Sequence, residues 1–246
     1  MDATRLSTVV STAGLAGPHL LAPAPLAPAS TKALLFELTD VLYESTVWRR
    51  WLLRLLARMG LHTNYQSFFE NWDRQFLSEI NSGRRTMREA LAAFLLENGL
   101  APTLVEEIVS AAGAQHKAIE AEPRLLPGVA ATLAQLAASG LPLAVSADTD
   151  QTADQVRAKL QKLGVAGQFR QVISSRDLRS AKPEPVCYLA AVTALGLTPH
   201  TVVFVGCRPT HLAGASAVGL TTVSVGGAAD ADHRLARFDQ LLQLFG

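Results

Sequence analysis

The fold is decided by the stretch Lys32-Ala-Leu-Leu-Phe-Glu-Leu-Thr-Asp-Val-Leu-Tyr-Glu-Ser45, an apolar run that ends abruptly in polar residues. Residues 33–36 are too few for a helix, and their apolar character predicts a buried β-strand. Glu37, Thr39 and Asp40 fall where this strand should end. In open α/β sheets the carboxyl ends of the strands face the ligand crevice, so these three side chains are the first candidates for a functional site.

The composition describes a globular protein and excludes several classes. The chain has 246 residues, of which 49% are hydrophobic and 17% are charged, which is enough for a sizeable core. Its formal net charge is +1, from 22 basic and 21 acidic residues, so no overall field attracts nucleic acid or an anionic membrane. No apolar run has the length needed to span a bilayer. The two cysteines, Cys187 and Cys207, are too few for a disulfide framework, and we expect free thiols in a cytoplasmic protein.

The first part of the chain divides into a tail and a helical segment. Residues 1–31 are rich in Ala, Pro, Ser, Thr and Leu, and their prolines interrupt the apolar part, which favours a flexible tail over a targeting peptide. Residues 46–122 contain four segments with helical spacing and no strand-like run, which predicts an all-helical cap. The first helix, Trp48–Met59, carries an apolar stripe beside several arginines. We expect this helix to pack in the cap, with binding of a partner as the alternative.

Helices and strands alternate from residue 123 onward. The predicted strands cover residues 141–145, 169–173, 201–205 and 220–225, with helices between them and a last helix at 232–244. Parallel strands need crossover connections, so this alternation predicts a Rossmann-like, doubly wound parallel sheet covered by helices on both faces. The strand at residues 33–36 belongs to this sheet. Residues 32–45 and 123–246 are therefore predicted to form an α/β core into which the helical cap, residues 46–122, is inserted.

Short motifs follow one another along the core in a recognisable order. They are Leu34-Leu-Phe-Glu-Leu-Thr-Asp-Val-Leu-Tyr-Glu-Ser45, Leu126-Pro-Gly-Val129, Leu143-Ala-Val-Ser146, Ala181-Lys-Pro-Glu-Pro185, Val203-Phe-Val-Gly-Cys-Arg208 and Ala215-Ser-Ala-Val-Gly219. This series resembles the haloacid dehalogenase superfamily, specifically the phosphoglycolate phosphatase and β-phosphoglucomutase-like branch, which has a helical cap inserted after the first motif. The resemblance covers residues 32–246 and implies the same core and cap.

The resemblance also implies roles for individual residues. In that family an aspartate after the first strand attacks phosphorus, and a second aspartate, two residues later, is the general acid and base. A hydroxyl residue and a lysine hold the phosphoryl group, and acidic residues of the fourth motif hold Mg²⁺. Ser146 and Lys182 match the hydroxyl and lysine positions, and Arg208 is a further candidate for binding an anion. In isolation, Ser146 would be interpreted as a helix cap and Lys182 as a solvated loop lysine.

Four positions depart from the family's pattern. Glu37 and Thr39 stand where the family has its two catalytic aspartates, and Cys207 and His211 stand where acidic metal ligands are expected. Glu37 keeps the carboxylate but adds a methylene, and a displacement of about 1 Å can cost on the order of a hundredfold in rate. Thr39 is no useful acid, and loss of general acid–base catalysis costs a further ~10²–10⁴-fold. A thiol and an imidazole are poor ligands for Mg²⁺, so we expect no metal site.

Three alternatives for these positions are less favoured. Asp40 is one residue out of register for the acid, because side chains alternate along an extended segment. Cys207 and His211 could hold zinc together with Glu37, but a structural zinc site usually needs four ligands. The same Cys-His pair could form a nucleophile and its base, although no recognised motif supports this. A buried thiol and a capping or surface imidazole are the simpler expectation.

The substitutions predict a catalytically impaired pseudo-hydrolase rather than a working enzyme. Ser146, Lys182 and Arg208 would remain to bind an anion without a metal, so the expected ligand is a phosphorylated small molecule or a protein partner. No cofactor is expected in this interpretation. The alternative is an active phosphatase for a small metabolite, with Glu37 as an unusual nucleophile and Mg²⁺ as its cofactor. Dehalogenation is less favoured, because it also depends on a well-placed aspartate.

Overall fold

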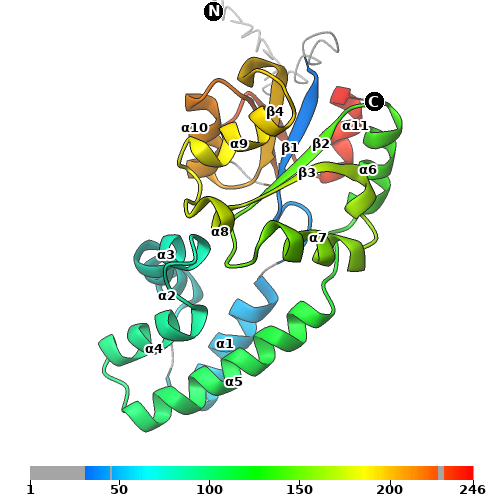
Figure 1. The fold of residues 1–246 in the computed structure, drawn as a ribbon. Coiled ribbons are helices and arrows are strands. Elements are labelled where there is room, and N and C mark those ends of the chain that lie inside the picture. The colour runs from blue at the N-terminus through cyan, green and yellow to red at the C-terminus, as the bar shows by residue number, and fades with distance from the viewer. Residues whose placement is uncertain (1–30, 45, 62, 227–229, 246) are drawn as a thin grey trace, which may run out of the picture.

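The computed structural model describes residues 31–246 except residues 45, 62, 227–229 and 246. The predicted tail, residues 1–31, therefore lies outside the described residues apart from Thr31. The chain forms a sheet flanked by helices and, beyond one end of the strands, a separate group of helices (Figure 1). In the part of the chain that is described, no helix combines the length and the apolar character needed to cross a membrane.

The described residues form one sheet of six parallel strands in the order β3-β2-β1-β4-β5-β6. The strands are β1 (Ala33–Glu37), β2 (Leu143–Ala147), β3 (Phe169–Ser174), β4 (Val202–Gly206), β5 (Thr221–Val225) and β6 (His233–Leu235). All five residues of β1 are buried, as expected for a parallel strand that is covered on both faces. The predicted doubly wound α/β fold is confirmed.

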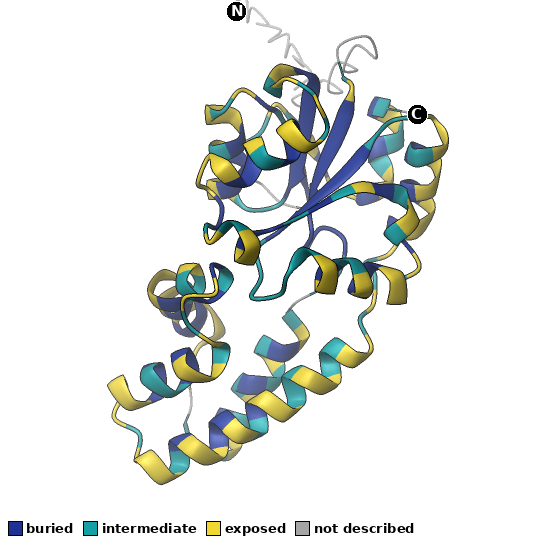
Figure 2. Ribbon diagram, in the orientation of Figure 1, coloured by how far each residue is buried: buried dark blue, intermediate teal, exposed yellow. Residues whose placement is uncertain are grey.

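Helices cover both faces of the sheet, and Figure 2 shows the strands buried between them. The helices of the core are α6 (Val129–Ala138), α7 (Ala153–Lys162), α8 (Ser175–Leu178), α9 (Val186–Ala194), α10 (Pro209–Ala217) and α11 (Leu241–Phe245). Alternate residues of β1 pack on opposite sides, since Phe36 joins the cluster that contains Leu133 of α6, whereas Leu35 joins the cluster that contains Tyr188 of α9. The side chain of Glu37 points to the same face as Leu35.

The cap consists of helices around an aromatic cluster. Its elements are α1 (Thr46–Arg58), α2 (Tyr65–Trp72), a π-helical turn (Asp73–Leu77), α3 (Ser78–Asn81), α4 (Met87–Glu97) and α5 (Pro102–Ala121). A capping box between Thr86 and Glu89 starts α4. Trp48 of α1 is buried in the cluster, and Trp51 and Leu55 are partly buried against it. The apolar stripe of α1 therefore packs within the cap, and a partner for this helix stays a prediction.

The prediction of a C-terminal helix at residues 232–244 is wrong for the first part of this segment. The segment first forms β6 and a 3₁₀ turn, and α11 begins only at Leu241. The side chain of Asp232 accepts hydrogen bonds of 2.8 Å from both the backbone N–H and the hydroxyl of Thr222. These bonds hold the segment beside β5, so that its backbone pairs with that strand. Pairing with a distant strand thus overrides the local helical pattern.

Candidate active site

The site lies where β1 and β4 are neighbours at the centre of the sheet. Strand order reverses at this point, because β2 and β3 lie on one side of β1 and β4 to β6 on the other. In doubly wound sheets, ligands bind at such a switch point outside the carboxyl ends of the strands. Glu37 ends β1, and the chain that leaves β4 supplies Cys207, Arg208 and, in the first turn of α10, His211. The fold therefore brings together four residues that the motifs singled out.

Glu37 is buried and both of its carboxylate oxygens have partners. A hydrogen bond of 2.7 Å joins Oε1 to Nδ1 of His211, and the backbone N–H of Cys207 donates to Oε2 at 3.2 Å. The guanidinium Nε of Arg208 lies 3.8 Å from Oε1. Burial raises the pKa of Glu37, but the His211 hydrogen bond and the charges of His211, Lys182 and Arg208 outweigh it, so the pKa stays below its usual value. Glu37 is therefore an ionised carboxylate.

Ser146 and Lys182 are adjacent, as the motifs predict, but they are engaged with the core itself. The Lys182 Nζ donates to the Ser146 carbonyl at 3.1 Å, to the Ser146 hydroxyl at 3.2 Å and to Oδ1 of Asp148 at 3.1 Å. The Ser146 hydroxyl donates to the carbonyl of Cys187 at 3.2 Å. The Lys182 side chain has no exposed area. The amine that the family resemblance assigns to a phosphoryl group is thus already paired with a carboxylate.

Asp148 is a site residue that the sequence reasoning missed. Its Oδ1 binds Lys182, whereas its buried Oδ2 has no hydrogen-bond partner among the described residues. That second oxygen lies 3.6 Å from Nε2 of His211, so the imidazole stands between the carboxylates of Glu37 and Asp148. The sequence offered a signal, because Asp148 comes two residues after Ser146, in the polar segment that follows the predicted strand at 141–145.

Thr39 and Asp40 lie in the loop after β1. Thr39 lines the pocket and its backbone forms a bridge with Tyr43, and it has no acidic proton to give to a leaving group. Asp40 has a φ of 62° in the left-handed region, and its backbone N–H donates to the carbonyl of Tyr43 at 2.8 Å. The carboxylate of Asp40 lies 3.8 Å from Nη2 of Arg208. Asp40 therefore interacts with the arginine at the rim of the site.

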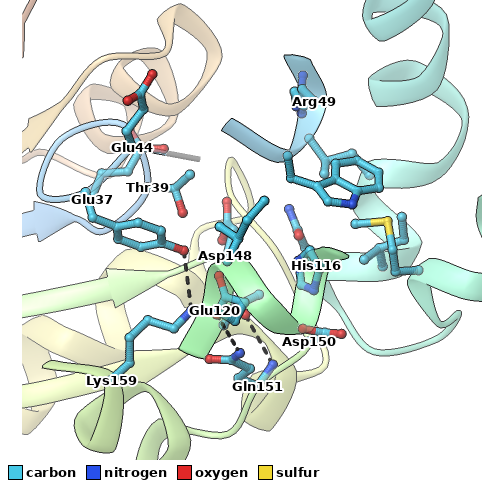
Figure 3. A pocket seen from close by; sticks show the side chains of 18 of the residues that line it. Glu37, Thr39, Glu44, Arg49, His116, Glu120, Asp148, Asp150, Gln151 and Lys159 are labelled. Atoms are coloured by element: carbon cyan, nitrogen blue, oxygen red, sulfur yellow. Dashed lines mark hydrogen bonds and ion pairs between the residues drawn. The ribbon is translucent and has the colours of Figure 1, made fainter. Parts of the chain in front are cut away.

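A pocket of about 140 Å³ lies between the core and the cap. Its core wall includes Glu37, Thr39, Tyr43, Asp148, Lys159 and Arg208, and its cap wall includes Trp48, Arg49, Trp72, His116 and Glu120. Figure 3 shows Glu37, Thr39 and Asp148 on one side of this space and Arg49 and His116 on the other. Ser146, Lys182 and His211 stand behind the wall rather than in it. Of the predicted site residues, Glu37, Thr39 and Arg208 can therefore touch a ligand directly.

A second charged group in the pocket was also missed by the sequence reasoning. The ammonium group of Lys159 in α7 forms an ion pair with Glu120 of α5 and lies 3.4 Å from the hydroxyl of Tyr43 (Figure 3). The Gln151 side-chain amide donates to the same Glu120 carboxylate at 3.2 Å. Burial lowers the pKa of Lys159, but Tyr43 and Glu120 outweigh it and raise the pKa above its usual value. No local pattern marks this pair, because Glu120 belongs to the cap and Lys159 to the core.

The donor set at Glu37 does not fit Mg²⁺. Within the described residues, no group of three or more His, Cys, Asp and Glu side chains is arranged to hold a metal ion. Burial raises the pKa of Cys207 to about 12, so its sulfur remains a neutral thiol and a poor ligand. The Oε1 atom of Glu37 has the ring of His211 as its neighbour, at 2.7 Å. The fourth-motif positions thus supply a thiol and an imidazole where Mg²⁺ requires oxygens.

Comparison with known proteins gives consistent similarities. The family model described as "haloacid dehalogenase-like hydrolase" matches residues 31–219. A phosphoglycolate phosphatase from Yersinia pseudotuberculosis serotype I (strain IP32953) is 32% identical over 184 residues, which are 64% of this chain and 78% of the relative. A glyceraldehyde 3-phosphate phosphatase from Methanopyrus kandleri is 29% identical over 199 residues, which are 79% of this chain and 83% of the relative.

Solved structures share the fold. A predicted phosphoglycolate phosphatase from Haemophilus somnus 129pt superposes with a TM-score of 0.67 at 18% identity, over 88% of this chain and 99% of that chain. The L-2-haloacid dehalogenase from Xanthobacter autotrophicus superposes with a TM-score of 0.57 at 20% identity, over 87% of this chain and 98% of that chain. At such identities, likeness establishes the architecture of core and cap, and the chemistry has to be argued from the residues.

Proposed function

The chain belongs to the haloacid dehalogenase-like hydrolase family, and we propose that it hydrolyses the phosphate ester of a small metabolite in the pocket between core and cap. The observation that carries the proposal is Glu37, an ionised carboxylate at the switch point of the sheet that lines this pocket. Both relatives described above are named as phosphatases. The relatives thus favour the phosphatase alternative over the prediction of a pseudo-hydrolase.

In the proposed reaction Glu37 is the nucleophile. One of its carboxylate oxygens forms a bond to phosphorus while the ester P–O bond breaks, and the leaving oxygen takes a proton from water. Water then attacks the glutamyl phosphate and releases inorganic phosphate and the free carboxylate. Arg208, which lines the pocket, offsets the charge of the phosphoryl group. Thr39 cannot protonate the leaving group, and the missing acid lowers the expected rate by ~10²–10⁴-fold.

Binding without hydrolysis is the second candidate, and specific contacts favour it. Both oxygens of Glu37 already accept hydrogen bonds, from His211 and from the backbone of Cys207. The amine of Lys182 is bound by Ser146 and Asp148 rather than left for a phosphoryl group. A protein built in this way would hold a phosphorylated metabolite in the same pocket and release it unchanged.

One experiment separates the two candidates. Phosphate release from 2-phosphoglycolate and glyceraldehyde 3-phosphate would be measured for the wild type and for Glu37→Gln, with calorimetric binding of each ester in parallel. Glu44→Gln is the matched control, because Glu44 also lines the pocket but contacts Thr46 and Arg50 instead of the site. Turnover that Glu37→Gln abolishes and Glu44→Gln preserves supports hydrolysis. Saturable binding without turnover supports the second candidate, and neither binding nor turnover refutes both.

A gain-of-function variant sharpens the same test. Thr39→Asp restores a carboxyl group at the position of the missing acid. If Glu37 attacks phosphorus and leaving-group protonation limits the rate, this variant should hydrolyse esters faster, by up to ~10²-fold. An unchanged rate in Thr39→Asp, together with an active wild type, would show that protonation at this position does not limit turnover.

The proposal extends to location and partners. Cys187 and Cys207 are both free thiols, which is consistent with the cytoplasmic location that we propose. The proposed ligand is a small molecule, and nothing in the composition favours nucleic acid. Fractionation of cells that express the chain would test its location.

A further inference from the structure

Three buried side chains stand in a row, two in the core wall of the pocket and the third, His211, behind it. The ring of His211 has Nδ1 at 2.7 Å from Oε1 of Glu37 and Nε2 at 3.6 Å from Oδ2 of Asp148. The exposed fractions of the three side chains are 4% for Glu37, 7% for His211 and 9% for Asp148. The three residues come from β1, from the loop after β2 and from α10. The imidazole is therefore held between two carboxylates, away from solvent.

Two buried carboxylates at close range need positive charge or hydrogen-bond donors nearby. Without them, the charges repel each other and each loses its hydration, so one carboxylate would have to take up a proton. Arg208 supplies positive charge near Glu37, and Lys182 forms an ion pair with Asp148. His211 is the group that faces both. In particular, its Nε2 lies 3.6 Å from Oδ2 of Asp148, which has no hydrogen-bond partner in the described part of the chain.

A metal ion would compete directly with this imidazole. Mg²⁺ binds carboxylate oxygens at about 2.0–2.1 Å in octahedral geometry, and between Glu37 and Asp148 it would have to occupy the space that the ring of His211 fills. Cys207 adds no oxygen in its place, and its thiol lies 3.9 Å from Oε2 of Glu37. An ion between the two carboxylates would therefore have to displace the imidazole ring.

We propose that His211 takes the place of a divalent cation between Glu37 and Asp148, so that the site binds a phosphorylated ligand without any metal. The claim that a phosphorylated ligand binds here rests on the proposed function. The claim that His211 replaces a metal ion does not. His211 acts through Glu37 and is therefore a positioning residue. It keeps the carboxylate ionised and directed toward the pocket, as a coordinated ion would.

The metal part is tested by titrating Mn²⁺ and following bound ion by electron paramagnetic resonance. We expect no saturable binding to the wild type and a gain of binding in His211→Asp, which replaces the imidazole by a third carboxylate. His211→Ala should gain weaker binding and covers the case in which the aspartate variant does not fold. His200→Asp is the matched control, since it makes the same exchange at an exposed position and should gain nothing. Saturable Mn²⁺ binding to the wild type that Glu37→Gln removes would overturn the proposal.

The ligand part is tested by calorimetry with 2-phosphoglycolate. Its affinity for the wild type should be the same in EDTA and in excess Mg²⁺, whereas the affinity of His211→Ala should fall about tenfold or more in EDTA and recover with Mn²⁺. Recovery by the ion distinguishes a role for charge from a role in packing. An affinity of the wild type that collapses in EDTA would contradict the proposal. Absence of all ester binding would refute the proposed function, while the Mn²⁺ titration would still decide the metal part.

Discussion

Two buried charged clusters face the same pocket, and they are built differently. The Glu37 cluster comprises Glu37, His211, Asp148 and Lys182, all from the α/β core. The Lys159 cluster comprises Lys159 and Tyr43 of the core together with Glu120 of the cap. In the first cluster the residues come from β1, the loop after β2, the segment between α8 and α9 and the first turn of α10, all within the core. In the second, one partner comes from the last turn of α5, just before the chain returns to the core (Figure 1).

This difference in construction gives the two clusters different physical roles. The Glu37 cluster keeps charged groups in fixed positions at the place where chemistry is proposed, and a rigid sheet supports it. The Lys159 cluster joins the two layers, so its ion pair depends on where the cap lies. We therefore expect substitutions in the first cluster to act mainly on global stability and on the site, and substitutions in the second to act mainly on the junction of cap and core.

The largest effect is expected for Lys182→Met. This change leaves Asp148 buried without its positive partner, and removal of one member of a buried ion pair typically costs about 3–5 kcal/mol. The free energy of unfolding would be measured by urea denaturation. The double variant Lys182→Met/Asp148→Asn should recover much of the loss, because the unpaired charge is gone. A loss below about 1 kcal/mol in the single variant would show that the pair is not buried as described.

The second prediction concerns acid stability and Glu37. The pKa of Glu37 is lowered in the folded protein, so the unfolded chain takes up a proton first as the pH falls. The stability that this group contributes is fully present above the ordinary carboxyl pKa and is lost as the pH falls through the lower, folded value. A charged hydrogen bond of this kind contributes about 1.5–3 kcal/mol. Urea midpoints between neutral and acidic pH should therefore fall less steeply for Glu37→Gln than for the wild type, and equal slopes would contradict the prediction.

The third prediction moves to the Lys159 cluster. Lys159→Met should cost only about 1 kcal/mol, because Glu120 is partly exposed and can be solvated when its partner is lost. Amide hydrogen exchange should become faster in the last turns of α5, while the amides of β1 should be unaffected. Glu120→Gln removes the other partner and should give the same pattern. Faster exchange throughout the sheet would mean that this cluster supports the core as well.

The same cluster has the opposite pH dependence. The pKa of Lys159 is raised in the folded protein, so its contribution is fully present below the ordinary lysine pKa and is lost as the pH rises through the higher, folded value. Lys159→Met should therefore approach the wild type in stability at strongly alkaline pH. The melting temperatures of the two proteins would be measured at neutral and at alkaline pH. A difference that stays constant between the two pH values would contradict the prediction.

The smallest effect is expected at Cys207, which touches the Glu37 cluster without an ion pair. Burial raises its pKa to about 12, against an ordinary value of 9.0, which leaves on the order of a thousandfold less thiolate than in an ordinary thiol. Burial also raises the pKa of Cys187. Neither thiol should react readily with a disulfide reagent at pH 8 in the native protein, and both should react in urea. Rapid native labelling of Cys207 would show that it is a reactive thiol.

The sequence predicted most members of the Glu37 cluster and missed the Lys159 cluster. Glu37, Ser146 and Arg208 stand in motifs at the ends of predicted strands, Lys182 stands in the motif of residues 181–185, and His211 was singled out because it occupies a family position for an acidic ligand. Asp148 was missed because the quoted motif ends at Ser146, two residues earlier. Lys159 and Glu120 carry no comparable signal, since a lysine and a glutamate on helical segments are ordinarily solvated.

The sequence by itself determined the parallel sheet, the helical cap and which strands end in polar residues. It could do so because runs of apolar residues and their periodicity are local properties of the chain. Only the tertiary structure decided which polar groups meet. Glu37 and His211 are 174 residues apart, and their hydrogen bond exists because β1 and β4 are neighbours at the centre of the sheet. The opening stretch therefore specified a buried strand that ends in a carboxylate, whereas the partners of that carboxylate, an imidazole and an arginine, were determined by the packing of distant elements.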